Sequence, residues 1–200
     1  VVLLALYAIA SYNGLIRGRN QVENAWSQID VQLKRRIDLI PNLVETVKAY
    51  AAHEKTTLEA VINARNAAIA APATPAGQAA ADGQMTGALR QLFALGEAYP
   101  DLKANQNFLE LQRELSDTEN KIQAARRFYN TTVMELNTKV DTFPSGIIAS
   151  WFNFTKREFF EIDEAEYTSI IMNHLDDESF SGEIRECVGA ALFKYIKHPL

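Results

Sequence analysis

One segment, Leu102–Phe143, constrains the fold of this chain more than any other. Its apolar side chains recur at alternating steps of three and four residues over about five heptads, from Phe108 through Ile122 and Tyr129 to Phe143. This period is typical of a helix that packs nearly antiparallel to its neighbours, at crossing angles of about 20°. At 1.5 Å per residue the helix would be about 60 Å long. It therefore needs a partner of similar length to cover its apolar stripe.

A second stretch, Gln21–Glu54, can provide that partner. Its apolar side chains, from Val22 to Ala51, also fall three or four residues apart and so share one helix face. Pro41 lacks an amide hydrogen and clashes with the preceding turn, which predicts a kink or break between Asp38 and Pro41. The apolar stripe keeps its phase across Pro41, and this favours a kink.

The rest of the chain supports an all-α fold. Residues Ala67–Gln84 are rich in Ala, Pro and Gly, with almost no large side chains, and are expected to form a loop. Met85–Ala98 has the spacing of a short helix, and the pattern after Thr155 suggests further short helices. We therefore expect an antiparallel up-and-down four-helix bundle with long helices.

The N-terminal segment, Val1–Ile16, is mostly apolar and precedes Arg17 and Arg19. As a helix it would measure about 24 Å, short of the roughly 30 Å hydrocarbon core of a bilayer. Two interpretations remain open: a truncated transmembrane helix, or a buried core helix or signal-peptide remnant. On the first, the basic residues that follow place the bundle on the cytoplasmic side of the inner or plasma membrane, in a single-pass arrangement.

Charge is distributed unevenly along the chain. Residues 1–154 carry 15 basic and 15 acidic side chains, whereas residues 155–200 carry 5 basic and 10 acidic ones and account for the net charge of −5. A neutral main body argues against a nucleic-acid partner, because phosphate binding needs a basic face. We expect three parts: an anchor (1–16), a helical bundle (17–154) and an acidic helical extension (155–200).

No reaction can be assigned from motifs. The three histidines lack the Glu-x-x-His spacing of di-iron bundles, the single cysteine cannot form an internal disulfide, and the glycines do not form a phosphate loop. We therefore expect no catalytic, cofactor-binding or metal-binding residue.

A set of polar residues beside the two long apolar stripes stands out. One hypothesis is that opposite charges on the two helices pair across the bundle and fix its register. The alternative is an ordinary solvated surface. The candidates for an interaction or register-setting role are Arg35, Arg36, Asp38, Asn42, Glu119, Asn120, Arg126, Arg127 and Asn130.

Four stretches carry a resemblance to a known family. They are YNGLIRGRNQVENAW (12–26), IDVQLKRRIDLIPNLVETVKAYAAHE (29–54), LFALGEAYPDLKANQNFLELQRELSDTENKIQAARRFYN (92–130) and FPSGIIAS (143–150). Together they resemble the LemA family over about residues 11–154, and the C-terminal extension is not matched. The resemblance implies a bacterial protein with an N-terminal membrane helix, four long helices and no established activity or ligand residues. One branch of the family is associated with magnetosome membranes.

The sequence and the resemblance lead to one functional expectation and two alternatives. The expectation is a non-enzymatic scaffold or adaptor, held at the membrane by its N-terminal helix and bound to protein partners. The alternatives are a protein that remodels or organises membranes, and an accessory subunit or enzyme with a polar site near the Pro41 kink, around Arg35, Arg36 and Asn42. Convergent polar side chains lining a pocket would favour the site; their absence would favour the scaffold.

Overall fold

The computed structural model describes residues 2–160, and every regular element in that range is a helix. The helices are α1 (Val2–Lys48), α2 (Lys55–Ala70), α3 (Pro75–Ala98), α4 (Pro100–Lys103), α5 (Gln106–Asp141) and α6 (Ser145–Trp151). The prediction of an all-α fold is confirmed for this range. The remaining helices expected in the acidic extension lie outside the described residues. Among the described helices, none is long and apolar enough to cross a membrane.

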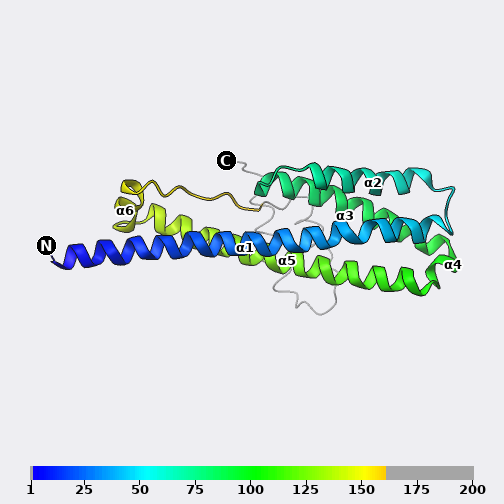
Figure 1. The fold of residues 1–200 in the computed structure, drawn as a ribbon, viewed down its shortest axis with the longest axis horizontal. Coiled ribbons are helices and arrows are strands. Elements are labelled where there is room, and N and C mark those ends of the chain that lie inside the picture. Colours follow the sequence, from blue (N-terminus) through cyan, green and yellow to red (C-terminus); the bar gives the residue numbers. More distant parts are fainter. Residues whose placement is uncertain (1, 161–200) are drawn as a thin grey trace, which may run out of the picture. The chain divides into compact units, whose positions relative to one another are not determined.

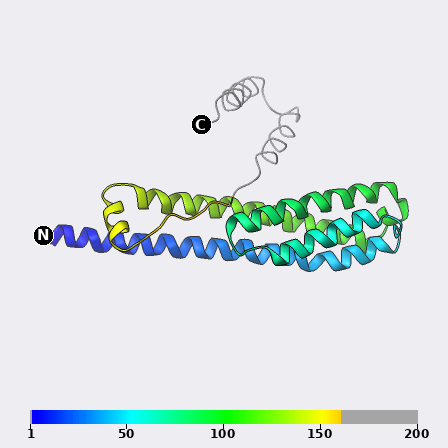
Figure 2. The ribbon, with the colours of Figure 1, turned by 90° about the horizontal axis from the view of Figure 1, so that it is seen from above.

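The longest helix, α1, packs along α5, and α2 and α3 form a hairpin beside them (Figure 1). Figure 2 shows the same pairing from above, with the hairpin alongside only one part of α1. Where four helices meet, a core forms from side chains such as Leu43 of α1, Val61 of α2, Met85 of α3 and Phe108 of α5. The other part of α1 packs against α5 and α6.

The expected disruption at Pro41 takes a milder form than a break, because α1 continues through this residue. Proline has no amide hydrogen, so the carbonyl of Ile37 loses its usual partner four residues later. Arg65 of α2 replaces that partner, donating from its Nε to the Ile37 oxygen at 3.3 Å. A neighbouring helix therefore satisfies the carbonyl that the proline frees.

The prediction of a loop at residues 67–84 is wrong for most of that range. Helix α2 continues to Ala70 and α3 begins at Pro75, so only residues 71–74 connect them. Thr74 caps α3 by accepting a hydrogen bond from the amide of Gly77 at 3.2 Å. Pro75 then occupies the first turn, where its missing N–H costs nothing. The alanines that resembled a loop are good helix formers once this cap is in place.

The long heptad helix, α5, begins later and ends earlier than the expected 102–143. Asn105 caps α5, accepting a hydrogen bond from the amide of Phe108 at 2.9 Å, and this cap separates α5 from the single turn of α4. The inward stripe of α5 is otherwise as predicted, with buried side chains from Phe108 to Leu136. Phe143, expected to face the core, lies beyond the end of α5 and is 84% exposed.

After α6 the chain turns back without helical structure, along α5 (Figure 1). Asn153 has a positive φ of 54°, a conformation that asparagine tolerates better than most residues. We call residues 154–160 the return segment. Only Phe160 within it is fully buried. The return segment belongs to the same compact unit as the helices.

Candidate functional site

The site with the highest density of buried charge joins three helices. Arg36 of α1, Asp82 of α3 and Arg126 of α5 are each no more than 3% exposed. An α1 residue reaches α3 and α5 here because Arg36 lies on the inward face, between Leu33 and Ile40. The three charges form one layer between two hydrophobic cores, the four-helix core and the core where α1 packs against α5 and α6.

The two arginines share the carboxylate of Asp82. Arg126 Nη2 lies 2.6 Å from Asp82 Oδ2, and Arg36 Nη2 pairs with Asp82 Oδ1. Arg36 Nη1 also lies 2.6 Å from Glu119 Oε2 on α5 and donates to Thr86 Oγ1 at 3.3 Å. We call Arg36, Asp82, Glu119 and Arg126 the charge layer. With two cations and two anions it is neutral, as charges removed from water require.

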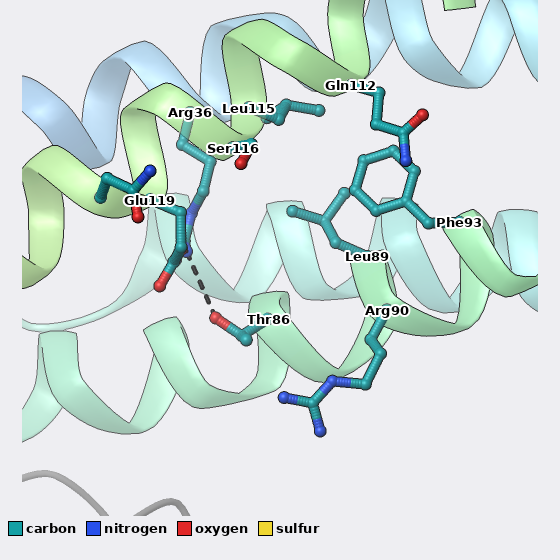
Figure 3. Close-up of a pocket in the computed structure, with 10 residues that line it drawn as sticks. Arg36, Thr86, Leu89, Arg90, Phe93, Gln112, Leu115, Ser116 and Glu119 are labelled. Atoms are coloured by element: carbon teal, nitrogen blue, oxygen red, sulfur yellow. Dashed lines mark hydrogen bonds and ion pairs between the residues drawn. The ribbon is translucent and has the colours of Figure 1, made fainter. Parts of the chain in front are cut away.

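An open cleft lies beside the charge layer, between α3 and α5. It has a volume of about 350 Å³ and is lined by Arg36, Thr86, Leu89, Arg90, Phe93, Gln112, Leu115, Ser116, Glu119 and Asn120. Figure 3 shows Arg36 reaching toward Thr86, while Arg90 points away from them. The polar groups at its inner end, Arg36 and Glu119, already pair with each other. Within residues 2–160, no group of three or more His, Cys, Asp or Glu side chains could hold a metal ion.

The structure divides the nine residues singled out from the sequence into groups. Arg36, Glu119 and Arg126 meet in the charge layer. Arg35 instead pairs with Glu114 at 2.8 Å on the surface, and this hydrogen bond raises the pKa of Arg35 above its ordinary value.

The remaining candidates lie apart from the charge layer. Asp38, Asn42 and Arg127 are exposed, and Asn120 borders the cleft. Asn130 faces the return segment, where its side-chain amide hydrogen-bonds to the backbone of Phe160. The nine candidates therefore do not gather around Pro41.

Asp82 is the central member of the charge layer, and sequence reasoning missed it. Asp82 was missed because residues 67–84 were expected to form a loop, and a residue in a loop cannot be assigned to a helix face. Two signals could have found it. Thr74–Pro75 is a recognisable helix start, and Asp82 lies three residues before Met85, on the same face of the extended helix. A lone carboxylate on an apolar face calls for a cationic partner, and Arg36 and Arg126 fill that role.

Comparison with known proteins settles the family. The model of the LemA family matches residues 25–172, well over half of the chain. This chain belongs to the LemA family. The match extends beyond Phe154, so the family model also covers part of the C-terminal extension.

Individual relatives of this LemA family chain include two kinds of protein. Protein LemA from Metamycoplasma hominis is 28% identical over 82% of this chain and 74% of its own length. Magnetosome protein MamQ 2 from Paramagnetospirillum magneticum is 24% identical over 89% of this chain and 75% of its own length. Magnetosome protein MamQ from Magnetospirillum gryphiswaldense is 23% identical over 84% and 71% respectively.

Proposed function

We propose that this chain is a membrane-associated helical scaffold with no reaction of its own. In this proposal α1, α2, α3 and α5 form an antiparallel up-and-down four-helix bundle at the cytoplasmic face of the cell membrane. The apolar start of α1 enters the bilayer, and the bundle presents a surface to protein partners.

The observation that carries the proposal is a concentration of exposed apolar side chains at the α6 end of the α1–α5 pair. Val2, Leu3, Leu6 and Ile9, on the first turns of α1, are each more than half exposed. Water-soluble surfaces rarely leave large apolar side chains clustered in this way, and such clusters mark membrane or protein contacts. Because α1 is one uninterrupted helix, whatever holds its apolar start also holds the bundle.

Helix α6 adds aromatic side chains to the same end. Trp151 is 74% exposed and Phe152 56% exposed, and the ring of Phe152 lies 4.7 Å from that of Tyr12 on α1. Aromatic side chains, tryptophan and tyrosine above all, are enriched where a protein crosses from lipid to water. Arg17 and Arg19 follow on α1, where basic residues favour an anionic cytoplasmic leaflet. The proposal therefore places the lipid boundary near Tyr12.

The charge layer supports a structural role for the most buried polar groups. Its arginines and carboxylates neutralise one another, which fits a layer that sets how α1, α3 and α5 align. The cleft beside it keeps an accessory subunit with a polar site as a second candidate. Membrane organisation is a further alternative, and the resemblance to magnetosome proteins favours it.

Flotation of the full chain with liposomes tests the membrane association. We expect the chain to float with vesicles that contain anionic lipid, and a Leu3→Asp/Leu6→Asp variant to stay behind. A Val31→Asp/Met134→Asp variant is the matched control, because these two side chains are also apolar and more than half exposed but lie away from the first turns of α1. Equal flotation of both variants would argue against insertion through α1. Cross-linking in the native membrane then tests for the protein partners that a scaffold requires.

A further inference from the structure

The return segment is held by two asparagines that act as substitutes for a neighbouring β-strand. Asn137 of α5 donates from its side-chain amide to the carbonyl of Arg157 at 2.9 Å and accepts from the amide of Arg157 at 2.8 Å. Asn130 makes the same two bonds with Phe160, at 3.1 and 2.9 Å. A carboxamide carries one acceptor and a donor group, like a peptide unit, so each asparagine satisfies both backbone groups of one residue.

The spacing of these two asparagines matches an extended chain. Seven residues separate them on α5, a rise of about 10.5 Å along a helix. Three residues separate Arg157 from Phe160, a rise of about 10 Å in an extended backbone. The two spacings therefore match. We call Asn130 and Asn137 the two rungs of α5, and an extended segment can hydrogen-bond to both of them in register. Because the bonds go to backbone atoms, the rungs recognise the conformation of a peptide and not its side chains.

Specificity comes from one side chain, that of Phe160. Its ring is fully buried, lies 4.5 Å from the guanidinium of Arg126 and 6.2 Å from the ring of Trp26. Tyr129 adds a hydrogen bond from its hydroxyl to the carbonyl of Glu158 at 2.9 Å. We call this site, formed by Asn130, Asn137, Trp26, Tyr129 and Arg126, the peptide groove. It fits an extended peptide with an aromatic side chain at its last rung.

Most of the return segment lies on the surface. Residues 155–159 are exposed, and the segment contributes two side chains to the core shared by α1, α5 and α6: Phe160, which is fully buried, and Phe154, which packs against it. It follows Asn153, whose positive φ marks the place where the chain changes direction after α6. Segments with few buried side chains detach at low cost in free energy. The same contacts would form in any second copy whose own segment had detached, and such exchange is a low-cost route to a dimer.

We propose that the peptide groove is an exchange site between copies of this chain, in which the return segment of one copy occupies the groove of another. Within residues 2–160 the return segment satisfies both rungs and the aromatic position, so the same segment of a second copy is the occupant. Exchange of the return segment requires neither membrane binding nor a partner protein. Confinement on a membrane surface would raise the effective concentration of one copy near another and so favour the exchange.

Two complementary variants of the full chain test the exchange. Phe160→Ala keeps the groove but weakens its own segment, whereas Asn130→Ala/Asn137→Ala keeps the segment but removes both rungs. Each alone is expected to form few dimers, and mixing them is expected to give a 1:1 heterodimer by native mass spectrometry. An excess of a synthetic peptide of residues 154–160 should abolish that heterodimer. A mixture with no more dimer than its components, while both variants keep the helical circular dichroism of the parent, would overturn the proposal.

Binding of a free peptide tests whether the groove takes the segment at all, independently of whether two copies exchange their segments. A fluorescent peptide of residues 154–160 should bind the Phe160→Ala chain at least about tenfold more tightly than the same chain with both rungs removed, since each lost hydrogen bond weakens binding severalfold. Binding of the peptide without any heterodimer in the mixture would show a groove that takes detached peptides, and would overturn exchange between copies.

A disulfide trap gives a second readout, in which the groove keeps Asn130 and loses the two hydrogen bonds of Asn137. In a Cys187→Ser background, one tagged chain carries Asn137→Cys and a differently tagged chain carries Arg157→Cys. Exchange brings these two positions together across copies, so mild oxidation should link the two tags. A chain with Arg127→Cys, an exposed position on α5, replaces the Asn137→Cys chain as a control. Equal linking in the two mixtures would contradict the proposal.

Discussion

At the scale of single residues, Arg36 and Arg35 are neighbours with opposite environments. Arg36 is 2% exposed and meets Asp82 and Glu119, whereas the side chains of Arg35 and its partner Glu114 are 44% and 41% exposed. A buried charge that loses its partner keeps the cost of leaving water, while an exposed charge is solvated again. The two arginines therefore form a matched pair in which burial is the main difference.

We expect Arg36→Met to lower the free energy of unfolding by about 3–5 kcal/mol, because the buried Asp82 loses one of its two arginines and the partly buried Glu119 loses its ion pair. Arg35→Met should change it by no more than about 1 kcal/mol, because its pair is exposed and screened. Urea denaturation followed by circular dichroism measures both. Similar losses for the two variants would show that the charge layer contributes no more than a surface pair.

At the scale of elements, one hydrogen bond compensates for the proline inside α1. Arg65 of α2 donates to the Ile37 carbonyl that Pro41 leaves without a helical partner. This bond links α2 to α1 at the turn where α1 lacks one of its own backbone hydrogen bonds. It also explains why an arginine near the middle of α2 turns toward α1 and not into solvent.

Arg65→Met is expected to destabilise the chain by about 1–3 kcal/mol, since it removes a hydrogen bond from a charged donor to a carbonyl inside the bundle. The loss should shrink in a Pro41→Ala background, because the restored amide at position 41 then satisfies the same carbonyl. A double-mutant cycle of denaturation midpoints gives the coupling between the two positions. Additive effects would mean that Arg65 does not act through Ile37.

Two glycines of α3 differ in the space around them. A Cβ at Gly96 would lie 2.9 Å from Cζ of the buried Phe108, whereas a Cβ at Gly87 would meet nothing within 4 Å. We expect Gly96→Ala to cost about 1–3 kcal/mol through overpacking. Gly87→Ala should instead stabilise the helix by about 0.5–1 kcal/mol. Thermal unfolding measures both, and a stabilised Gly96→Ala chain would mean that α3 and α5 lie further apart than described.

The elements also show which parts of the structure the sequence could predict. The stripe from Phe108 to Leu136 was predictable because a 3.5-residue period directly reports one buried face. Residues 75–84 were not, since small alanine side chains carry no periodic signal and the Thr74–Pro75 cap was the only local cue. Asp82 lies in this stretch and was missed for the same reason. The return segment has no pattern of its own, because its conformation depends on asparagines elsewhere in the chain.

At the scale of the described unit, residues 2–160, polar and apolar features occur in a definite order along α1. The apolar first turns come first, then the core shared with α5 and α6, then the charge layer, and last the four-helix core. Trp151 is exposed at the end of α6, the short helix that packs beside α1. We therefore predict that this end of the unit, and not its sides, meets lipid.

Depth-dependent quenching of Trp151 tests this prediction most directly. The sequence contains two tryptophans, so Trp26→Phe leaves Trp151 as the single reporter in the full chain. On addition of vesicles with anionic lipid, we expect its emission to shift to shorter wavelength and to be quenched by lipids brominated near the headgroup more than by lipids brominated at the chain ends. Unchanged emission from a chain that floats with the vesicles would contradict the proposed placement of α6 at the lipid boundary.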